Sequence, residues 1–385
     1  MHPFGCTAVN RPVNNVSFFT KVNDLGMHSR VCRQPGKNTA EGDGMFGLVA
    51  QGTGVKYAEI PDAVIEQPHD AVVELVAGSI CGSDLHLLEY DIPMAFPIGH
   101  EAIGVVRECG SALTELSVGD RVLLAGDTGC GTCRPCLAGE IKRCKNNGFG
   151  IYGTPGGLGG CQAELIRVPH AGFNTMKIPD NVSDLQALAL TDCLPTAYNA
   201  VVQASVPRGG TVVVIGLGPI GLIATELAFT FGAACVFAVD VLPDRIDRAK
   251  ALGAIAVTPD EAEDAVRAAT GGNLADSVIE AVGTKATVDL ALKLTGANRT
   301  LSILGAVHGV DVSVPFESAL RGITLRTDQT TEIPKYWSEL VPLVRWGRVH
   351  PEAVFTHTYN LKDGVEAYQK ARSREAGTIK ILLEP

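Results

Sequence analysis

Hydrophobic and polar residues follow two different patterns along this chain. In the first half, apolar stretches such as 45–51 (MFGLVAQ) and 71–80 (AVVELVAGSI) predict strands that end in turns. In the second half, the apolar segments 211–215 (TVVVI) and 235–240 (CVFAVD) begin a regular alternation of strands and helices. That alternation is typical of a doubly wound parallel sheet.

The alternation extends to about residue 306. Helices are predicted near 244–252, 260–270 and 285–294, and strands at 254–257 (AIAV), 277–282 (SVIEAV) and 300–306 (TLSILGA). Within 330–357, the spacing of Trp and Leu predicts a helix that packs on the core.

Four cysteines lie close together in a Gly-rich stretch with the spacing C-x2-C-x2-C-x7-C, namely Cys130, Cys133, Cys136 and Cys144. Thiolates at this spacing can close a tetrahedral shell around Zn²⁺, whereas core-packing cysteines would follow a helix or strand period. A ferredoxin-type iron–sulfur run would have its fourth Cys three residues on and then Pro, and a disulfide framework would suit a small secreted chain. We therefore expect a structural zinc site.

A glycine motif directly follows the strand at 211–215. The sequence GLGPIG matches G-x-G-x-x-G, with a strand before it, a helix after it and an acidic residue at the end of the next strand. Its first glycine permits a tight turn, its second lets the backbone approach a pyrophosphate, and its third allows the helix to pack on the strand. The helix N-terminus would face the phosphates of a dinucleotide. The predicted cofactor-binding residues of this turn are Gly216, Gly218, Pro219, Ile220 and Gly221.

Asp240 ends the second strand of the predicted sheet. A carboxylate at this position accepts hydrogen bonds from the adenosine ribose and repels a 2′-phosphate, which selects NAD over NADP. Arg245 lies about one helical turn further along and could cover the adenine.

A second set of potential metal ligands lies upstream of the four cysteines. Cys81 follows a predicted strand at the point where the chain turns, and His100 stands in a Gly-His-Glu turn. Alone, such a pair is more often a buried Cys and a hydrogen-bonded core His. Beside a four-thiolate cluster, the pair becomes a candidate metal site.

Together these motifs resemble those of the medium-chain zinc-dependent alcohol dehydrogenases, from about Met45 to the C-terminus. CGSDLH, GHE, the four cysteines, LTDCLPTAY and GLGPIG carry the resemblance. It implies an α/β protein with a GroES-like, mostly-β catalytic domain and a doubly wound Rossmann nucleotide-binding domain. It also implies hydride transfer between an alcohol, or a hydrated aldehyde, and NAD, with one catalytic and one structural Zn²⁺ per chain.

The resemblance further implies that Cys81, His100 and one residue of LTDCLPTAY hold the catalytic zinc. Alignment on the Thr-Ala-Tyr of that segment places Asp192 at the third position, with Cys193 as the alternative. The Leu-Thr-Asp-x-x-Pro-Thr run resembles the branch that contains the glutathione-independent formaldehyde dehydrogenases, which use the Asp. An oxygen ligand is harder than a thiolate, so the zinc would keep more positive charge.

The same resemblance implies roles for three nearby residues, and a fourth is expected to be structural. Ser83 matches the hydroxyl that takes the alcohol proton and His86 matches the outer end of a relay to solvent; a turn-capping Ser and a surface His are the alternatives. Glu101 either ligates the metal when substrate is absent or orients the ligands. Asp84 is expected to hold its loop through backbone hydrogen bonds. Zinc would activate the alcohol at an open fourth position by lowering the pKa of the bound hydroxyl.

The composition is that expected of a cytoplasmic enzyme. The chain has 385 residues, 46% of them hydrophobic, which is enough for a sizeable core and two domains. Its eleven cysteines indicate reduced thiols in a reducing compartment. The net charge of −10 argues against a nucleic-acid partner, and no stretch approaches the roughly 18 apolar residues of a membrane span. We expect a small-molecule substrate and, from the resemblance, a homodimer or homotetramer.

The changes of pattern suggest domain limits. Residues 1–44 have few apolar runs and are expected to form a disordered extension or to follow from an upstream start codon, with a weak transit peptide as the alternative. Residues 45–200 would form the catalytic domain, completed by 326–385, and residues 201–325 the nucleotide-binding domain. The active site would lie in the cleft between the two domains.

Two other functions are compatible with parts of the sequence. One is a zinc-free quinone or enone reductase of the same superfamily, which lacks the catalytic ligands. The other is a non-enzymatic zinc or redox module, since a cysteine cluster can release metal when oxidised. A full ligand set and a complete nucleotide motif argue against both. By resemblance, Met94, Phe96 and Leu194 lie near the pocket wall, and they leave the substrate undecided.

Overall fold

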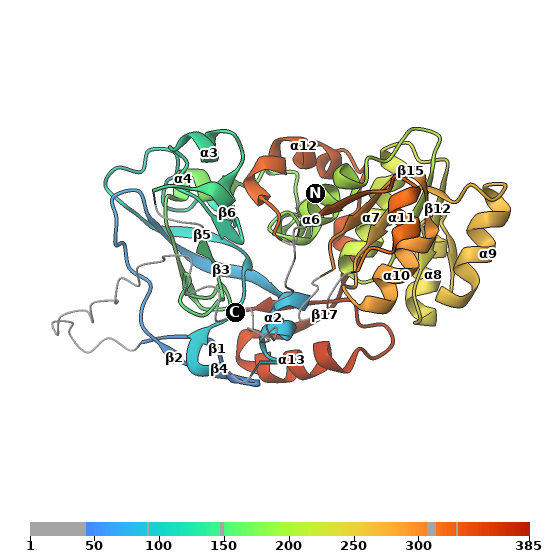
Figure 1. Ribbon diagram of the computed structural model, residues 1–385. Helices are drawn as coiled ribbons and strands as arrows, with labels where there is room; N and C mark the ends of the chain where they lie inside the picture. The colour runs from blue at the N-terminus through green and yellow to red at the C-terminus, as the bar shows by residue number, and fades with distance from the viewer. Residues whose placement is uncertain (1–43, 91, 147–149, 306–312, 329) are drawn as a thin grey trace, which may run out of the picture.

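The computed structural model describes residues 44–90, 92–146, 150–305, 313–328 and 330–385. The predicted extension 1–44 lies outside the described residues, apart from Gly44. Two groups of secondary structure lie side by side, and the C-terminal segment joins the first group again (Figure 1).

The first group consists mainly of short strands. They are β1 Met45–Gly52, β2 Gly54–Ile60, β3 Ala71–Ile80, β4 Ile92–Pro97, β5 Glu101–Cys109, β6 Arg121–Leu124, β7 Asp127–Thr128, β8 Gly150–Ile151, β9 Leu165–Val168, β10 Thr175–Lys177, β17 Phe355–Asn360 and β18 Lys380–Glu384. A seven-stranded sheet has the order β10-β6-β5-β3-β18-β17, with β9 paired to β3, and a three-stranded sheet has the order β2-β1-β4. This half is the expected mostly-β domain.

Short helices connect the strands of this half, and one long helix leads out of it. They are α2 Gly82–Leu87, α3 Arg134–Leu137, α4 Ala171–Asn174, α5 Asp184–Ala189 and α6 Cys193–Ala204. The domain limit predicted at residue 200 therefore falls inside α6.

The second group is a six-stranded parallel sheet with the order β13-β12-β11-β14-β15-β16. Its strands are β11 Thr211–Ile215, β12 Cys235–Val239, β13 Ile255–Val257, β14 Ala275–Glu280, β15 Thr295–Ile303 and β16 Thr324–Thr327. Its helices are α7 Pro219–Thr230, α8 Pro243–Ala251, α9 Pro259–Ala269, α10 Lys285–Leu294 and α11 Phe316–Leu320. The predicted alternation of strands and helices is confirmed.

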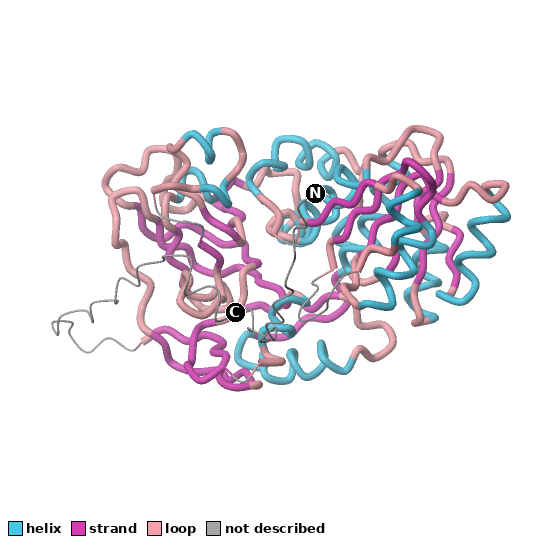
Figure 2. The backbone as a smooth tube through the Cα atoms, viewed as in Figure 1, coloured by secondary structure: helices cyan, strands magenta, loops and turns pink. Residues whose placement is uncertain are grey.

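The apolar residues of β11 explain why helices cover both faces of this sheet (Figure 2). Val212 and Val214 belong to one core cluster with residues of α6 and α7. Val213 and Ile215 belong to another, with residues of α9 and α10. Successive residues of a strand point to opposite faces, so a continuous apolar run has to be buried on both sides.

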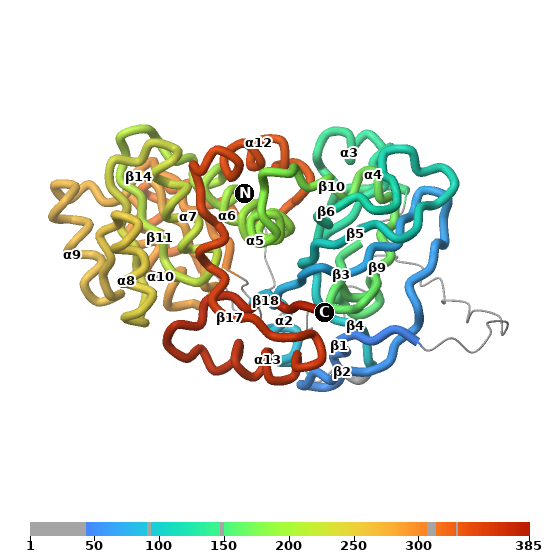
Figure 3. Tube along the Cα trace, turned by 180° about the vertical axis from the view of Figure 1, so that it is seen from behind, coloured from blue at the N-terminus to red at the C-terminus, as the bar shows by residue number. Residues whose placement is uncertain are grey.

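The C-terminal segment returns to the first group through α12 Ile333–Arg345, α13 Gly364–Ser373 and β18 (Figure 3). The predicted helix within 330–357 is α12, which packs on α6 and donates a hydrogen bond from Trp337 Nε1 to the carbonyl oxygen of Leu190 at 2.9 Å. β18 pairs antiparallel with β3, Ile381 opposite Ile80. No helix in the described ranges has the length and apolar character needed to cross a membrane.

Candidate active site

Three predicted metal ligands come together from three separate segments. Cys81 follows the last residue of β3, His100 precedes β5, and Asp192 is the N-cap residue of α6. Asp192 Oδ2 lies 3.3 Å from Cys81 Sγ and 3.5 Å from His100 Nε2. With Glu101 included, one ligand atom from each residue lies within 4.8 Å of the others.

Local hydrogen bonds and one glycine shape the two loops that carry Cys81 and His100. Asp84 Oδ2 accepts the backbone N–H of Cys81 at 3.0 Å, at the start of α2. Gly99 has a φ of +94°, in the region where a side chain would be strained. This turn leads into β5 immediately after His100.

The two candidates for the third ligand have different surroundings. Asp192 turns Oδ2 toward Cys81 and His100, while its Oδ1 accepts a hydrogen bond of 2.8 Å from Thr196 Oγ1. Cys193 is 1% exposed, and its Sγ donates to the carbonyl oxygen of Ala189 at 3.6 Å, in the preceding helix. These contacts favour Asp192 as a ligand and Cys193 as a core residue.

The charges of this cluster fit a bound cation. Burial opposes protonation of His100, but Asp84 and Asp192 raise its pKa well above the ordinary value. Burial also opposes ionisation of Asp192, but His100 lowers the pKa of Asp192 strongly. A positive charge is therefore stabilised between these side chains. Thiolate, imidazole and carboxylate groups are all ligands that Zn²⁺ accepts.

Asp84 does more than hold its own loop. In addition to the bond with Cys81, its Oδ1 lies 3.1 Å from His100 Nδ1. The second nitrogen of His100, Nε2, faces Asp192. A carboxylate at Nδ1 fixes the imidazole tautomer and leaves Nε2 available for a metal. Sequence reasoning missed this contact, because nothing in the spacing of Asp84 and His100 indicates it.

Glu101 is fixed by a lysine to which sequence reasoning gave no role. Lys380 Nζ lies 2.8 Å from both carboxylate oxygens of Glu101, and the Ser79 hydroxyl donates to Oε2. Glu101 is fully buried and Lys380 is 3% exposed. Burial disfavours the lysine charge, but Glu101 and neighbouring acidic groups raise the pKa of Lys380. The pairing of β18 with β3 brings these residues together.

The four cysteines of the C-x2-C-x2-C-x7-C run form a second cluster, with their Sγ atoms within 4.8 Å of one another. The backbone N–H of Cys133 and the side chain of Asn146 donate to Cys130 Sγ at 3.4 and 3.3 Å. Burial raises the pKa of Cys130, but donors from Thr132 and Cys133 outweigh it and lower the pKa to about 5. N–H groups directed at sulfur favour the thiolate, which is the metal-binding form.

The glycine motif forms the turn between β11 and α7. Gly216 has a φ of +90°, and a Cβ at Gly221 would lie 1.7 Å from the carbonyl oxygen of Gly216. Gly218 is the N-cap of α7, Pro219 is its first residue, and a Cβ at Gly218 would have only Arg245 Nη1 near it, at 3.9 Å. The backbone N–H groups at this helix N-terminus provide a site for phosphate.

Asp240 closes the neighbouring strand and is tied to the glycine turn. Its Oδ2 accepts the backbone N–H of Leu217 at 2.7 Å, and its Oδ1 accepts the N–H groups of Val241 and Leu242. Arg245 Nη1 lies 3.9 Å from Asp240 Oδ2, and its buried Nε has no hydrogen-bond partner among the described residues. A positive group therefore lies beside Asp240 and Gly218.

The metal ligands and the glycine turn face one cleft of about 400 Å³. Its lining includes Ser83, His86, His100, Asp192 and Gly218. Ser83 Oγ lies 3.4 Å from His100 Nε2, and His86 is partly exposed. The candidates Met94, Phe96 and Leu194 are not among the lining residues; Phe96 and Leu194 are buried in core clusters and Met94 is 57% exposed.

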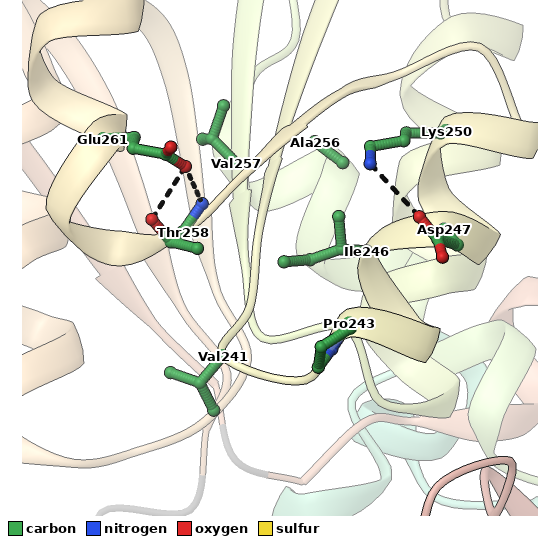
Figure 4. A pocket seen from close by; sticks show the side chains of 9 residues that line it. All are labelled: Val241, Pro243, Ile246, Asp247, Lys250, Ala256, Val257, Thr258 and Glu261. Atoms are coloured by element: carbon green, nitrogen blue, oxygen red, sulfur yellow. Dashed lines mark hydrogen bonds and ion pairs between the residues drawn. The ribbon is translucent and has the colours of Figure 1, made fainter.

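A separate hollow lies at the outer end of the parallel sheet (Figure 4). Val241 and Pro243 form its floor, next to Asp240, and Thr258 and Glu261 form one wall through the cap of α9. It contains none of the predicted metal ligands. It adjoins Asp240 through Val241, the next residue in the chain.

Two family models match the halves of the chain. The alcohol dehydrogenase GroES-like domain matches residues 67–180, and the zinc-binding dehydrogenase matches residues 219–346. The "Probable zinc-binding alcohol dehydrogenase" of Mycobacterium tuberculosis is 39% identical over 345 residues, 89% of each chain. The chain belongs to the medium-chain zinc-dependent alcohol dehydrogenases. This dehydrogenase is thus a zinc-dependent alcohol oxidoreductase.

Other relatives agree with this assignment. An alcohol dehydrogenase of Cupriavidus necator is 32% identical and covers 83% of this dehydrogenase and 92% of its own length. The solved structure of the alcohol dehydrogenase from Thermus sp. ATN1 has a TM-score of 0.82 and 33% identity, and covers 88% of this chain and 99% of its own. The expected combination of GroES-like and Rossmann domains is confirmed.

Proposed function

We propose that this dehydrogenase transfers a hydride between an alcohol, or a hydrated aldehyde, and NAD at the cluster of Cys81, His100 and Asp192. The observation that carries the proposal is that these ligands and the glycine turn line the same cleft. A hydride donor and acceptor must come into contact, so a site for both in one cleft is the arrangement that the reaction needs.

Cys81, His100 and Asp192 would hold the catalytic zinc, and the cluster of four cysteines a second, structural zinc. The catalytic ion supplies Lewis acidity, which lowers the pKa of a bound hydroxyl into the neutral range. Glu101 is engaged by Lys380 and Ser79, so we assign it to orienting the site rather than to ligating the metal.

Ser83 and His86 would carry the hydroxyl proton out of the cleft. Ser83 Oγ is at the ligand cluster, and His86 lines the same cleft with a side chain that is 30% exposed. Ser83 Oγ would accept the substrate proton and release its own toward His86. An imidazole in contact with water exchanges protons readily near neutral pH.

Asp240 supports NAD as the cofactor. Three backbone N–H groups bond to its carboxylate, which holds a negative charge where the adenosine ribose would lie. A 2′-phosphate at that point would be repelled. The guanidinium group of Arg245, whose Nη1 lies beside Gly218, would contact the cofactor there.

The cleft wall supports small substrates. Leu87, Tyr90 and Ile151 provide apolar surface beside Thr154. Such a wall favours short alcohols or aldehydes over polyols. The position of Asp192 supports a relation to the branch of the glutathione-independent formaldehyde dehydrogenases, so hydrated formaldehyde belongs among the test substrates.

A second copy of the chain would pair with the outer edge of β16. All four residues of β16 are exposed, and no described strand pairs with its outer edge. The neighbouring α11 exposes Phe316 by 77% and Leu320 by 72%. An exposed edge strand beside an apolar patch is suited to a twofold contact, in which identical strands pair. We therefore propose a homodimer, or a tetramer built from such dimers.

Zinc content and turnover test this function together. We expect two zinc ions per chain in the wild type and one in Cys81→Ala, with NAD reduction lost on a panel of short alcohols and hydrated formaldehyde. NADH binding should persist in the variant, because the glycine turn is unchanged. One zinc in both proteins, with no turnover on any substrate, would contradict the proposal.

A further inference from the structure

A chain of buried polar side chains lies behind the metal-binding histidine. Tyr368, in α13, donates its hydroxyl to Gln162 Oε1 at 2.9 Å. Gln162 Nε2 donates to the carbonyl oxygen of Ser79 at 3.1 Å and lies 3.5 Å from Asp84 Oδ2. Asp84 Oδ1 in turn lies 3.1 Å from His100 Nδ1. The chain thus leads from a C-terminal helix to a ligand of the catalytic cluster.

None of the first three members of this chain faces the substrate cleft. Tyr368 is 3% exposed, Gln162 and Asp84 are fully buried, and none of them lines the cleft. A buried polar group costs free energy unless it is hydrogen-bonded, and Gln162 uses both ends of its amide. A contact with substrate therefore does not explain these residues.

The Tyr368 hydroxyl decides which way the Gln162 amide faces. With the O–H donated to Oε1, the amide nitrogen is directed at the carbonyl oxygen of Ser79 and the carboxylate of Asp84, which are both acceptors. A flipped amide would place its oxygen against those two acceptors. The hydroxyl thus keeps an N–H donor at Asp84.

The turn before His100 is built around the same glutamine. A Cβ at Gly99 would lie 2.4 Å from Gln162 Cγ, so the glutamine fills the space that a side chain at Gly99 would need. Gln162 therefore contacts the histidine loop by packing as well as by hydrogen bonding.

We propose that Gln162 and Tyr368 are positioning residues that orient His100 for metal binding through Asp84. The proposal rests on the function proposed above. The N–H donor from Gln162 stabilises the buried carboxylate of Asp84, and Oδ1 of that carboxylate faces His100 Nδ1 at 3.1 Å as its ion-pair partner. Nε2 is then presented to the metal as a lone pair in a fixed direction.

Zinc release from the holoenzyme tests the proposal with matched variants. Gln162→Met removes the amide at similar size, and Tyr368→Phe removes only the hydroxyl. Tyr152→Phe is the control, because Tyr152 is 2% exposed, belongs to the same core cluster as Tyr368, and donates to the carbonyl oxygen of Arg167 instead. Release into a chromophoric chelator is followed for both zinc ions, together with the visible spectrum of the Co²⁺-substituted catalytic site.

We expect Gln162→Met to release one of its two zinc ions about tenfold faster than wild type, which is the lower end for partners of a metal ligand. Tyr368→Phe should show a smaller increase at the same site and no further increase in the Gln162→Met background. Both variants should shift the Co²⁺ spectrum, and Tyr152→Phe should behave as wild type.

Two results would overturn the inference alone. One is release at the control rate in both Gln162→Met and Tyr368→Phe; the other is an additive effect of the two changes, which would make Tyr368 independent of Gln162. A wild type that holds only one zinc would overturn the proposed function itself and the inference with it.

Discussion

At the scale of single residues, neighbours in the sequence can have opposite environments. Asp192 faces Cys81 and His100, whereas Cys193 is directed into the core. We expect Asp192→Ala to lose one zinc and, because Lewis acidity is worth several kcal/mol, to lower kcat/KM roughly 10³-fold. Cys193→Ser should keep both zinc ions and most turnover. Zinc content per chain and steady-state kinetics distinguish the two candidate ligands. Two zinc ions per chain in Asp192→Ala would identify Cys193 as the ligand.

The Lys380–Glu101 pair gives a second prediction at this scale. Lys380→Met would leave the buried carboxylate of Glu101 without its counter-charge, and such a loss typically costs about 3–5 kcal/mol of stability. Adding Glu101→Gln should recover most of that loss, since the unpaired charge is then removed. Urea unfolding of the single and double variants measures both effects. Equal stability of Lys380→Met and wild type would mean that the pair is not a structural requirement.

At the scale of elements, two glycines at the start of α7 are predicted to have different roles, one in cofactor binding and the other in stability. A Cβ at Gly218 would make only an ordinary contact, with Arg245 Nη1 at 3.9 Å, whereas one at Gly221 would overlap the Gly216 carbonyl. Gly218→Ala should therefore keep the stability of the wild type but bind NADH about tenfold more weakly, because the methyl group blocks the approach of the pyrophosphate. Gly221→Ala should lose at least about 3 kcal/mol of stability. Fluorescence titration and thermal unfolding test the two changes; unchanged affinity in Gly218→Ala would argue against phosphate binding at this turn.

Elements whose signal is local could be predicted from the sequence, and contacts between distant segments could not. The parallel sheet follows from apolar runs separated by helical periods, and the four-cysteine cluster follows from its close spacing. The set of Cys81, His100 and Asp192 came from the family resemblance, because its members lie in three separate segments. The role of Lys380 depends on the pairing of β18 with β3, some 300 residues apart in the chain. Likewise, Gln162 and Tyr368 lie in segments without a metal motif. Met94, Phe96 and Leu194 were expected at the pocket wall but do not line the cleft, because resemblance alone could not show which face of β4 or of α6 each side chain occupies.

At the scale of the whole molecule, polar contacts connect the cysteine cluster with the join between the two halves. Lys142, which lies between Cys136 and Cys144, forms an ion pair with Asp328. Asp328 also accepts from Asn199 at 3.1 Å, and Asn199 accepts the hydroxyl of Tyr336 in α12. A zinc ion that orders the cysteine loop would thereby fix Lys142 at the join. Through Lys142, the cysteine loop thus contacts the segment that closes the molecule.

The last prediction concerns assembly of the protein through the exposed patch of α11 and β16. Wild type should elute at twice the 40.4 kDa chain mass or a multiple of that. Leu320→Arg places a charge in the proposed twofold contact, where two copies of the charge would face each other, and should halve the mass. Val118→Arg, at a position 64% exposed in the other half, is the matched control and should leave the mass unchanged. Light scattering after size exclusion measures all three proteins. A substitution at an exposed site alone changes the free energy of unfolding by about 0.5 kcal/mol or less, so unfolding would not explain a change of mass. A change of mass confined to Leu320→Arg would therefore locate the interface at α11. Equal masses in all three proteins would place the interface elsewhere.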